Sequence, residues 1–244
     1  MRFLKKLLRL TVFFILLVAV IGGGKLTWDG YQIYKEAVTA VPLEEKVSEI
    51  RSNENYTPIS ELPQTYVNAV VAVEDKRFYR HPGIDPIATG RAVLINLKEK
   101  ELAEGGSSIT QQLAKNMYFS QEKKFLRKVA ELFVAFDLER NYTKQEILEL
   151  YVNTIYFGNG YYCVYDASEG YFHKKPSEMT DYESTLLAGI PNAPSVYALT
   201  NRPELAAQRQ RTILACMVDQ GYLTRQQADG ILQEAQQAAD SRGE

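Results

Sequence analysis

Apolar positions along this chain recur with the spacing of helices. Residues 66–73 are almost continuously apolar, and helical patterns also run over 88–102 and 123–140. In the last of these segments the apolar side chains form one stripe, at Phe125, Val129, Leu132 and Phe136. No series of segments shows the two-residue alternation that would build a large sheet. The pattern therefore predicts a mainly α fold.

Polar residues mark where several of these helices begin and end. A threonine followed three residues later by glutamate or glutamine is a capping box, which opens a helix. Such boxes stand at Thr143 with Glu146, Thr180 with Glu183, and Thr224 with Gln227. Pro203 suits the first turn of a further helix and Gly221 suits its end. We therefore expect helices after each of these start signals.

The N-terminus has the pattern of a membrane-targeting segment. Basic residues come first, at Arg2, Lys5, Lys6 and Arg9, and the largely apolar stretch over 7–26 covers 20 residues. This length just spans a bilayer, and the basic flank directs the N-terminus toward the cytoplasm. We predict four segments: a basic cytoplasmic tail over 1–9, a transmembrane anchor over 10–26, a connector over 27–62 and the main domain over 63–244.

One alternative stays open for the apolar stretch. The small residues at 22–24 would also suit the cleavage site of a secretory signal. Trp28, Tyr31 and Tyr34 favour the anchor, because aromatic rings gather at membrane interfaces. In both cases the main domain lies outside the cytoplasm.

The composition suits one globular domain plus an anchor. The chain has 244 residues, of which 45% are hydrophobic and 24% charged. Its formal net charge of -2 excludes a general basic field, so we expect no nucleic acid as a partner. An anionic ligand would have to meet a local cluster of cations, for which Lys115, Arg127 and Lys128 are the candidates.

The thiols and imidazoles do not indicate a metal centre. Cys163 and Cys216 could form one disulfide or remain two free thiols. His81 and His173 are far apart in the sequence, and no cysteine pair has the spacing of a zinc site. We therefore expect no structural metal.

Three polar clusters interrupt the apolar pattern, at 74–81, 105–116 and 127–131. In the third, Arg127 and Lys128 stand four and three residues before Glu131, on one helix face. Carboxylates that accept a proton, hydroxyls and amides that hold polyols, and cations that neutralise phosphate are the groups that sugar transfer needs. The alternative for the third cluster is a solvated helix face with ordinary salt bridges.

The second cluster contains a row of polar side chains. Ser108, Gln112 and Asn116 recur at intervals of four, so a helix would place them on one face. Such a row could line a sugar cleft. Helix capping and solvation are the alternative.

Together the clusters resemble the ordered motifs of the peptidoglycan glycosyltransferases, the lysozyme-like family 51 enzymes that polymerise lipid II. The similarity spans roughly 43–224 in five motifs. The first comprises Glu74, Asp75, Phe78, His81 and 83–85, and the second is 105–116. The third comprises Arg127, Lys128, Glu131, Ala135 and 138–139. The fourth comprises 147–149, Tyr151, Asn153, 156–158 and Gly160, and the fifth comprises 187–191, Pro194 and Tyr197.

The resemblance implies a lysozyme-like, two-lobed glycosyltransferase domain over 63–244. It implies that Glu74 is the base for the 4-hydroxyl of an acceptor N-acetylglucosamine, with lipid II as acceptor and the growing glycan as donor. The product would be a β-1,4 glycan formed with inversion, and undecaprenyl diphosphate would leave. Glu131 would act electrostatically through Arg127 and Lys128 rather than by proton transfer, with a structural salt bridge as the alternative.

Other roles follow from the same resemblance. The cations expected at the pyrophosphate are Lys115, Arg127 and Lys128. The groups expected at the sugars are Ser108, Gln112 and Asn116. Asp75, Phe78 and His81 would shape the substrate site around Glu74, with core packing as the alternative for Phe78 and a structural role as the alternative for His81.

The resemblance also implies a setting and partners. No cofactor is required, although a divalent cation, Mg²⁺ or Mn²⁺, could assist the diphosphate. We expect a single-pass protein of the bacterial inner membrane with its catalytic domain on the extracytoplasmic side, and a monofunctional enzyme without a transpeptidase. Expected partners are lipid II, the growing glycan strand and membrane lipids, together with cell-wall transpeptidases or proteins of the divisome or elongasome.

Two other functions compete with this one. A lytic glycoside hydrolase would also use a glutamate in a lysozyme-like cleft, but it would not need three cations near a second carboxylate. A catalytically silent scaffold would not need Glu74 and Glu131.

The chain departs from the family pattern at two positions that matter here. Ser108 replaces a threonine and keeps the hydroxyl. Cys163 replaces a glycine, and cysteine tolerates a positive φ poorly, so the backbone conformation at this position is in question.

Overall fold

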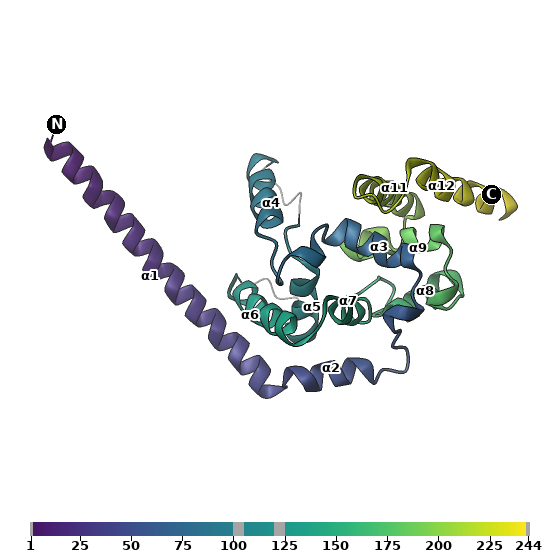
Figure 1. Ribbon diagram of the computed structural model, residues 1–244, viewed down its shortest axis with the longest axis horizontal. Helices are drawn as coiled ribbons and strands as arrows, with labels where there is room; N and C mark the ends of the chain where they lie inside the picture. The colour runs from purple at the N-terminus through teal and green to yellow at the C-terminus, as the bar shows by residue number, and fades with distance from the viewer. Residues whose placement is uncertain (1, 100–104, 120–124, 243–244) are drawn as a thin grey trace.

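The protein is a bundle of short helices from which one long helix extends, as a computed structural model shows (Figure 1). The structure describes residues 2–99, 105–119 and 125–242, and within these ranges it contains no β-strand. The α-helices are α1 (Arg2–Ala40), α2 (Leu43–Arg51), α3 (Gln64–Glu74), α4 (Pro86–Glu99), α5 (Ile109–Tyr118), α6 (Phe125–Asn141), α7 (Lys144–Val152), α8 (Val164–Phe172), α9 (Asp181–Leu187), α10 (Pro194–Tyr197), α11 (Pro203–Asp219) and α12 (Arg225–Arg242). Single 3₁₀ turns lie at Ile59–Glu61, Phe78–Arg80, Pro176–Glu178 and Ile190–Asn192. The prediction of a mainly α fold is confirmed.

The predicted helix starts are confirmed as well. In all three capping boxes the threonine side chain accepts a backbone N–H, and the glutamate or glutamine side chain accepts the N–H of the threonine. α11 begins at Pro203, and Gly221, with a φ of 75°, follows its end. α3, α4 and α6 correspond to the three apolar segments, of which 100–102 and 123–124 lie outside the described residues. These signals act over three or four residues, which is why the sequence alone predicts them.

The apolar stripe predicted for α6 is only partly buried, with Val129 and Leu132 half-buried. Phe125 and Phe136 are 71% and 44% exposed, whereas Ala130, Val134 and Leu138 are buried. α6 packs against both α1 and α5. Because α1 and α5 cover two sides of α6, the small and medium side chains face the interior. The two phenylalanines lie outside the covered sides.

The segment predicted as anchor and connector is helical for most of its length. α1 runs through the anchor to Ala40, and α2 follows within the connector. The C-terminal part of α1 packs along α6, so the connector belongs in part to the folded body (Figure 1). Within the described part of the chain, none of the helices combines the length with the mean hydropathy that a bilayer crossing needs. The anchor at 10–26 stays a prediction.

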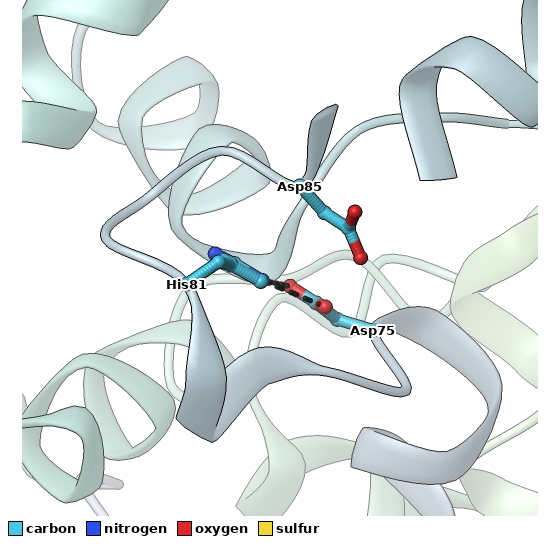
Figure 2. Close-up of side chains that lie close together, drawn as sticks. All are labelled: Asp75, His81 and Asp85. Atoms are coloured by element: carbon cyan, nitrogen blue, oxygen red, sulfur yellow. Dashed lines mark hydrogen bonds and ion pairs between the residues drawn. The ribbon is translucent and has the colours of Figure 1, made fainter. Parts of the chain in front are cut away.

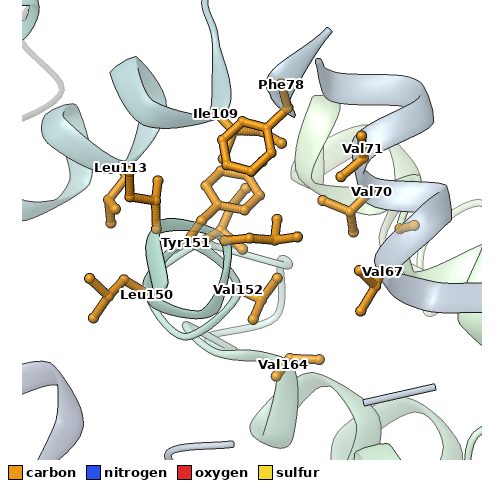
Figure 3. Packing of buried hydrophobic residues seen from close by; sticks show 14 of the residues in the cluster. Val67, Val70, Val71, Phe78, Ile109, Leu113, Leu150, Tyr151, Val152 and Val164 are labelled. Atoms are coloured by element: carbon orange, nitrogen blue, oxygen red, sulfur yellow. The ribbon is translucent and has the colours of Figure 1, made fainter. Parts of the chain in front are cut away.

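The core lies where α3 faces α7. Figure 3 shows its buried side chains, including Val67, Val70 and Val71 of α3 with Leu150, Tyr151 and Val152 of α7. Phe78 and Ile109 belong to the same cluster. Since α3 ends at Glu74 and α5 begins at Ile109, this core positions the two helix ends that meet at the candidate site.

Both cysteines are free thiols, which excludes the disulfide alternative in this structure. Cys163 is the N-cap of α8, and its φ of −146° is extended backbone that any residue adopts. The replacement of a family glycine at this position therefore requires no left-handed conformation.

Candidate active site

Glu74 is the last residue of α3, and only one of its two carboxylate oxygens accepts a hydrogen bond from the residues that the structure describes. Gln112 Nε2 donates to Glu74 Oε2 at 2.9 Å, and the Tyr151 hydroxyl donates to Gln112 Oε1 at 3.4 Å. The hydroxyl therefore orients the amide, and the amide orients the carboxylate. Glu74 Oε1 is shielded from solvent and has no hydrogen-bond partner among the residues that the structure describes. This oxygen is free to accept a proton.

The surroundings of Glu74 strengthen it as a base. Burial raises the pKa of Glu74, because a carboxylate taken out of water resists ionisation. The hydrogen bond from Gln112 and the charges of Arg209 and Lys115 act against this rise in pKa, while Asp75 adds to it. A carboxylate with a raised pKa takes a proton more readily than an ordinary one.

Asp75 ties the loop after α3 to the start of α5. The His81 ring points at the Asp75 carboxylate (Figure 2), with Nε2 2.9 and 3.0 Å from its two oxygens. The backbone N–H of Ile109 donates to Asp75 Oδ2 at 3.1 Å. Asp75 and His81 are both buried. They support the end of α3 from within the protein.

Asp75, His81 and Asp85 also bring ligand atoms within 4.8 Å of one another, a distance that would suit a cation (Figure 2). Both carboxylates already have partners within the chain. Arg77 pairs with Asp85 through Nε at 2.8 Å, and the backbone N–H of Ala88 donates to the same carboxylate at 2.7 Å. The Arg77 guanidinium holds the pKa of Asp85 down to about 2. We assign this cluster a structural role.

Phe78 likewise supports the site from the core. Its ring is fully buried, and Lys144 Nζ lies 4.4 Å from the ring centroid. Core packing, the alternative that the sequence left open for Phe78, describes its environment, and the structural role left open for His81 describes that of His81. Neither side chain presents a surface to a ligand in this structure.

The second carboxylate, Glu131, is completely buried in α6 and holds two cations. Arg127 Nε donates to Oε1 at 3.0 Å and Lys128 Nζ donates to Oε2 at 2.5 Å. The Arg127 side chain is 17% exposed and the Lys128 side chain 44% exposed. The predicted meeting of these residues on one helix face is confirmed. Two cations on one carboxylate leave net positive charge that can attract an anion.

Lys115 links the two carboxylates electrostatically. It is half-buried on α5, and burial lowers the pKa of its ammonium. Glu131 and Glu74 both act to raise that pKa, while Lys128 and Arg127 act to lower it. Because charge interactions weaken with distance, Lys115 lies within electrostatic reach of both carboxylates. The site thus combines a proton acceptor with a cluster of cations.

The polar row predicted on α5 forms only in part, because Ser108 lies before the helix whereas Gln112 and Asn116 lie on it. Ser108 is the N-cap of α5 and is buried. Its hydroxyl accepts the backbone N–H of Gln111 at 3.1 Å and donates to the Gly83 carbonyl at 2.5 Å. A residue that precedes the first helical turn does not follow the helical spacing, so Ser108 points inward. Helix capping, the alternative left open by the sequence, is its structural role.

Asn116, at the other end of the row, is exposed. It donates to the carbonyl of Thr154 at 3.4 Å and lines a hollow of about 290 Å³ that also includes Asn53 and Tyr162. Gln112 contacts Glu74, whereas Ser108 and Asn116 have other partners.

Arg209 is a site residue that the sequence analysis missed. It lies on α11, and its charge lowers the pKa of Glu74, which ends α3. Arg209 Nε is buried without a hydrogen-bond partner among the described residues. A Cβ on Gly189, a glycine of the fifth motif, would lie 3.0 Å from Arg209 Cγ. The glycine therefore leaves room for the Arg209 side chain to pass beside the backbone. The sequence shows Arg209 as one of two arginines in the helix over 203–219, and nothing local distinguishes it.

Comparison with known proteins identifies the family. Residues 36–218 match the family model described as Transglycosylase. A protein of Cupriavidus necator named as a transglycosylase is 41% identical over 220 residues, which cover 90% of this chain and 94% of that protein. The match therefore extends over nearly the whole length of both proteins.

Longer proteins match as well. Penicillin-binding protein 1F of Bacillus subtilis is 46% identical over 177 residues, 72% of this chain and 25% of that protein. Penicillin-binding protein 1A of Aquifex aeolicus is 42% identical over 172 residues, 70% of this chain and 24% of that protein. This chain thus spans about a quarter of the length of these two relatives.

Proposed function

This chain belongs to the transglycosylase family of peptidoglycan glycosyltransferases, and from that premise we propose that it polymerises lipid II into β-1,4 glycan strands. The growing glycan is the donor, lipid II is the acceptor, and undecaprenyl diphosphate leaves. The observation that carries the proposal is Glu74, a carboxylate with one oxygen held by Gln112 and the other without a partner among the described residues.

In the proposed reaction Glu74 acts as the general base. It takes the proton of the acceptor 4-hydroxyl as that oxygen attacks the anomeric carbon of the donor. The bond from this carbon to the diphosphate oxygen breaks, and its electron pair leaves with the diphosphate. One direct displacement inverts the carbon from α to β, so one base suffices. The raised pKa of Glu74 supports this role.

The cations provide the counter-charge for the departing diphosphate. Lys115 and Lys128 offer ammonium groups, and Arg127 offers a planar fork suited to phosphate oxygens. Glu131 holds Arg127 and Lys128 in place and transfers no proton in this scheme. No step requires a metal, because the chain supplies positive charge itself. A divalent cation travelling with the diphosphate would add to that charge.

We further propose a lysozyme-like, two-lobed arrangement of 63–244 outside the cytoplasm and a single membrane pass at 10–26. The basic tail before the apolar run supports this location, and so does α1, which extends away from the body in Figure 1. Lipid II, the glycan strand and membrane lipids are the proposed partners, together with transpeptidases or other proteins of cell-wall synthesis.

The direct test is incubation of the detergent-solubilised chain with labelled lipid II. Muramidase-sensitive polymer from the wild type, and none from Glu74→Gln, would support the proposal. Cleavage of preformed glycan without polymerisation would instead indicate the hydrolase. Neither activity would indicate the silent scaffold.

Substituting Lys128 by alanine is expected to weaken binding of the leaving group. Loss of one charged hydrogen bond should raise the inhibition constant of inorganic pyrophosphate about ten- to a hundredfold. Stability should change by less than about 1 kcal/mol, since the Lys128 side chain is 44% exposed and Arg127 still pairs with Glu131. Inhibition assays and thermal unfolding measure the two effects.

Lys46→Ala is the matched control for Lys128→Ala. Lys46 forms the same i,i+3 ion pair with Glu49 on α2. Unchanged inhibition by pyrophosphate in Lys128→Ala would count against the proposed anion site.

Replacing Arg209 by methionine is expected to shift the pH dependence of polymerisation. Without the positive charge the pKa of Glu74 rises further, so the base is protonated up to a higher pH. In the profile of kcat/KM against pH, the acidic limb should shift to higher pH, and activity should recover in more alkaline buffer. Arg209→Lys keeps the charge and should leave the limb in place. Identical profiles for Arg209→Met and the wild type would refute this assignment.

A further inference from the structure

α1 packs along α6, the helix that carries the cation cluster. The Tyr31 and Tyr34 rings lie 5.4 and 5.5 Å, centroid to centroid, from the Phe133 ring. The Tyr34 hydroxyl also donates to Asp137, one turn further along α6. Aromatic contact and a hydrogen bond therefore fasten the C-terminal part of α1 to α6.

The two helices pack tightly at Gly30. A Cβ at this position would be 2.5 Å from both Cβ and Cγ1 of Val129, and 3.3 Å from the carbonyl oxygen of Leu126. Carbon atoms in contact rest about 3.5–4.0 Å apart. Rotation of the valine cannot relieve the clash, because its Cβ is fixed to the backbone. Any residue other than glycine would push the helices apart by roughly 1 Å.

Val129, the α6 residue that contacts Gly30, lies in the sequence between Lys128 and Glu131 of the cation cluster. Val129 directly follows Lys128 and stands two residues before Glu131, so a shift of α6 at Val129 displaces the groups that face the anion. A displacement of about 1 Å is large on the scale that positioned charges tolerate.

We propose that Gly30 is a positioning residue for the anion site, through which α1 holds α6 where Lys128 and Arg127 can bind the diphosphate. This inference rests on the proposed function, which identifies the anion. Gly30 lies outside the residues 36–218 that match the family model, whereas Val129 lies inside them. Because α1 also contains the predicted anchor, the position of the anchor and the affinity for the diphosphate are coupled.

Glycines of the same helix give a matched experiment in the full-length, detergent-solubilised protein. Gly30→Ala introduces the clashing methyl group, whereas Gly23→Ala introduces one with no atom within 4 Å. Alanine favours a helix over glycine by about 1 kcal/mol, so both substitutions should strengthen α1 itself. The measured quantities are the inhibition constant of inorganic pyrophosphate, the pH profile of kcat/KM and the midpoint of thermal unfolding.

Gly30→Ala is expected to raise the inhibition constant of pyrophosphate about tenfold, roughly 1.4 kcal/mol. The acidic limb of the pH profile should stay in place, because Glu74 belongs to α3 and not to α6. Gly23→Ala should match the wild type. Gly30→Ala combined with Val129→Gly should have a lower inhibition constant than Gly30→Ala alone, because removal of the valine side chain gives the methyl group room.

The outcomes separate this inference from the proposed function. Absence of polymer from the wild type would overturn the proposed function. If the wild type polymerises lipid II but Gly30→Ala and Gly23→Ala have equal inhibition constants, the positioning role of Gly30 alone is overturned. A lowered unfolding midpoint with unchanged pyrophosphate inhibition would also overturn it, since the contact would then be merely structural.

Discussion

Substituting Glu74 by glutamine is expected to abolish polymerisation of lipid II while the protein remains folded. The amide has the size of the carboxylate and can still accept the hydrogen bond from Gln112 through its oxygen. It cannot take a proton from the acceptor hydroxyl. Loss of a general base lowers the rate by about 10²–10⁴-fold. The measurement is the initial rate of polymer formation from labelled lipid II.

The stability of Glu74→Gln provides an independent check on the same residue. The folded-state pKa of Glu74 is raised, so protonated Glu74 contributes stability at low pH that is lost as the pH rises through the folded pKa. Glutamine stays neutral at every pH, so the variant does not lose this stability as the pH rises. At neutral pH the variant should unfold at a temperature equal to or above that of the wild type. Polymerisation near the wild-type rate would overturn Glu74 as the base.

Substituting Glu131 by glutamine should reduce both stability and activity. Glu131 is completely buried and accepts from Arg127 and Lys128, so the neutral amide leaves two cations without their counter-charge. Breaking a buried ion pair costs about 3–5 kcal/mol, and exposure of 44% of the Lys128 side chain reduces this to roughly 2–3 kcal/mol. Thermal or denaturant unfolding measures the loss of stability.

A second ion pair with the same spacing supplies the control for Glu131→Gln. Glu49 pairs with Lys46 on α2, and the Glu49 side chain is 67% exposed. Glu49→Gln should change stability by less than about 1 kcal/mol and leave polymerisation intact. If Glu131→Gln proved as stable as Glu49→Gln, the cations would not depend on Glu131. If it kept full activity, its electrostatic role in the reaction would be refuted.

The features that the sequence alone determined depend on local interactions. The three capping boxes form as predicted, because each joins residues three positions apart. The contacts of Arg127 and Lys128 with Glu131 form for the same reason, since helical geometry brings residues three and four apart together. The ordered motifs likewise identified the family, which the match over residues 36–218 confirms.

The features that only the tertiary structure decided join residues far apart in the chain. Glu74 receives its hydrogen bond from Gln112, 38 residues later, and the charge of Arg209 acts on it from α11. α1 meets α6 at Gly30 and Val129, while Phe125 on the same helix is exposed. Periodicity shows which side chains share a face of one helix, but not which neighbour covers that face. The choice of neighbour depends on how all the helices pack at once, because each buried face must find a partner of matching shape.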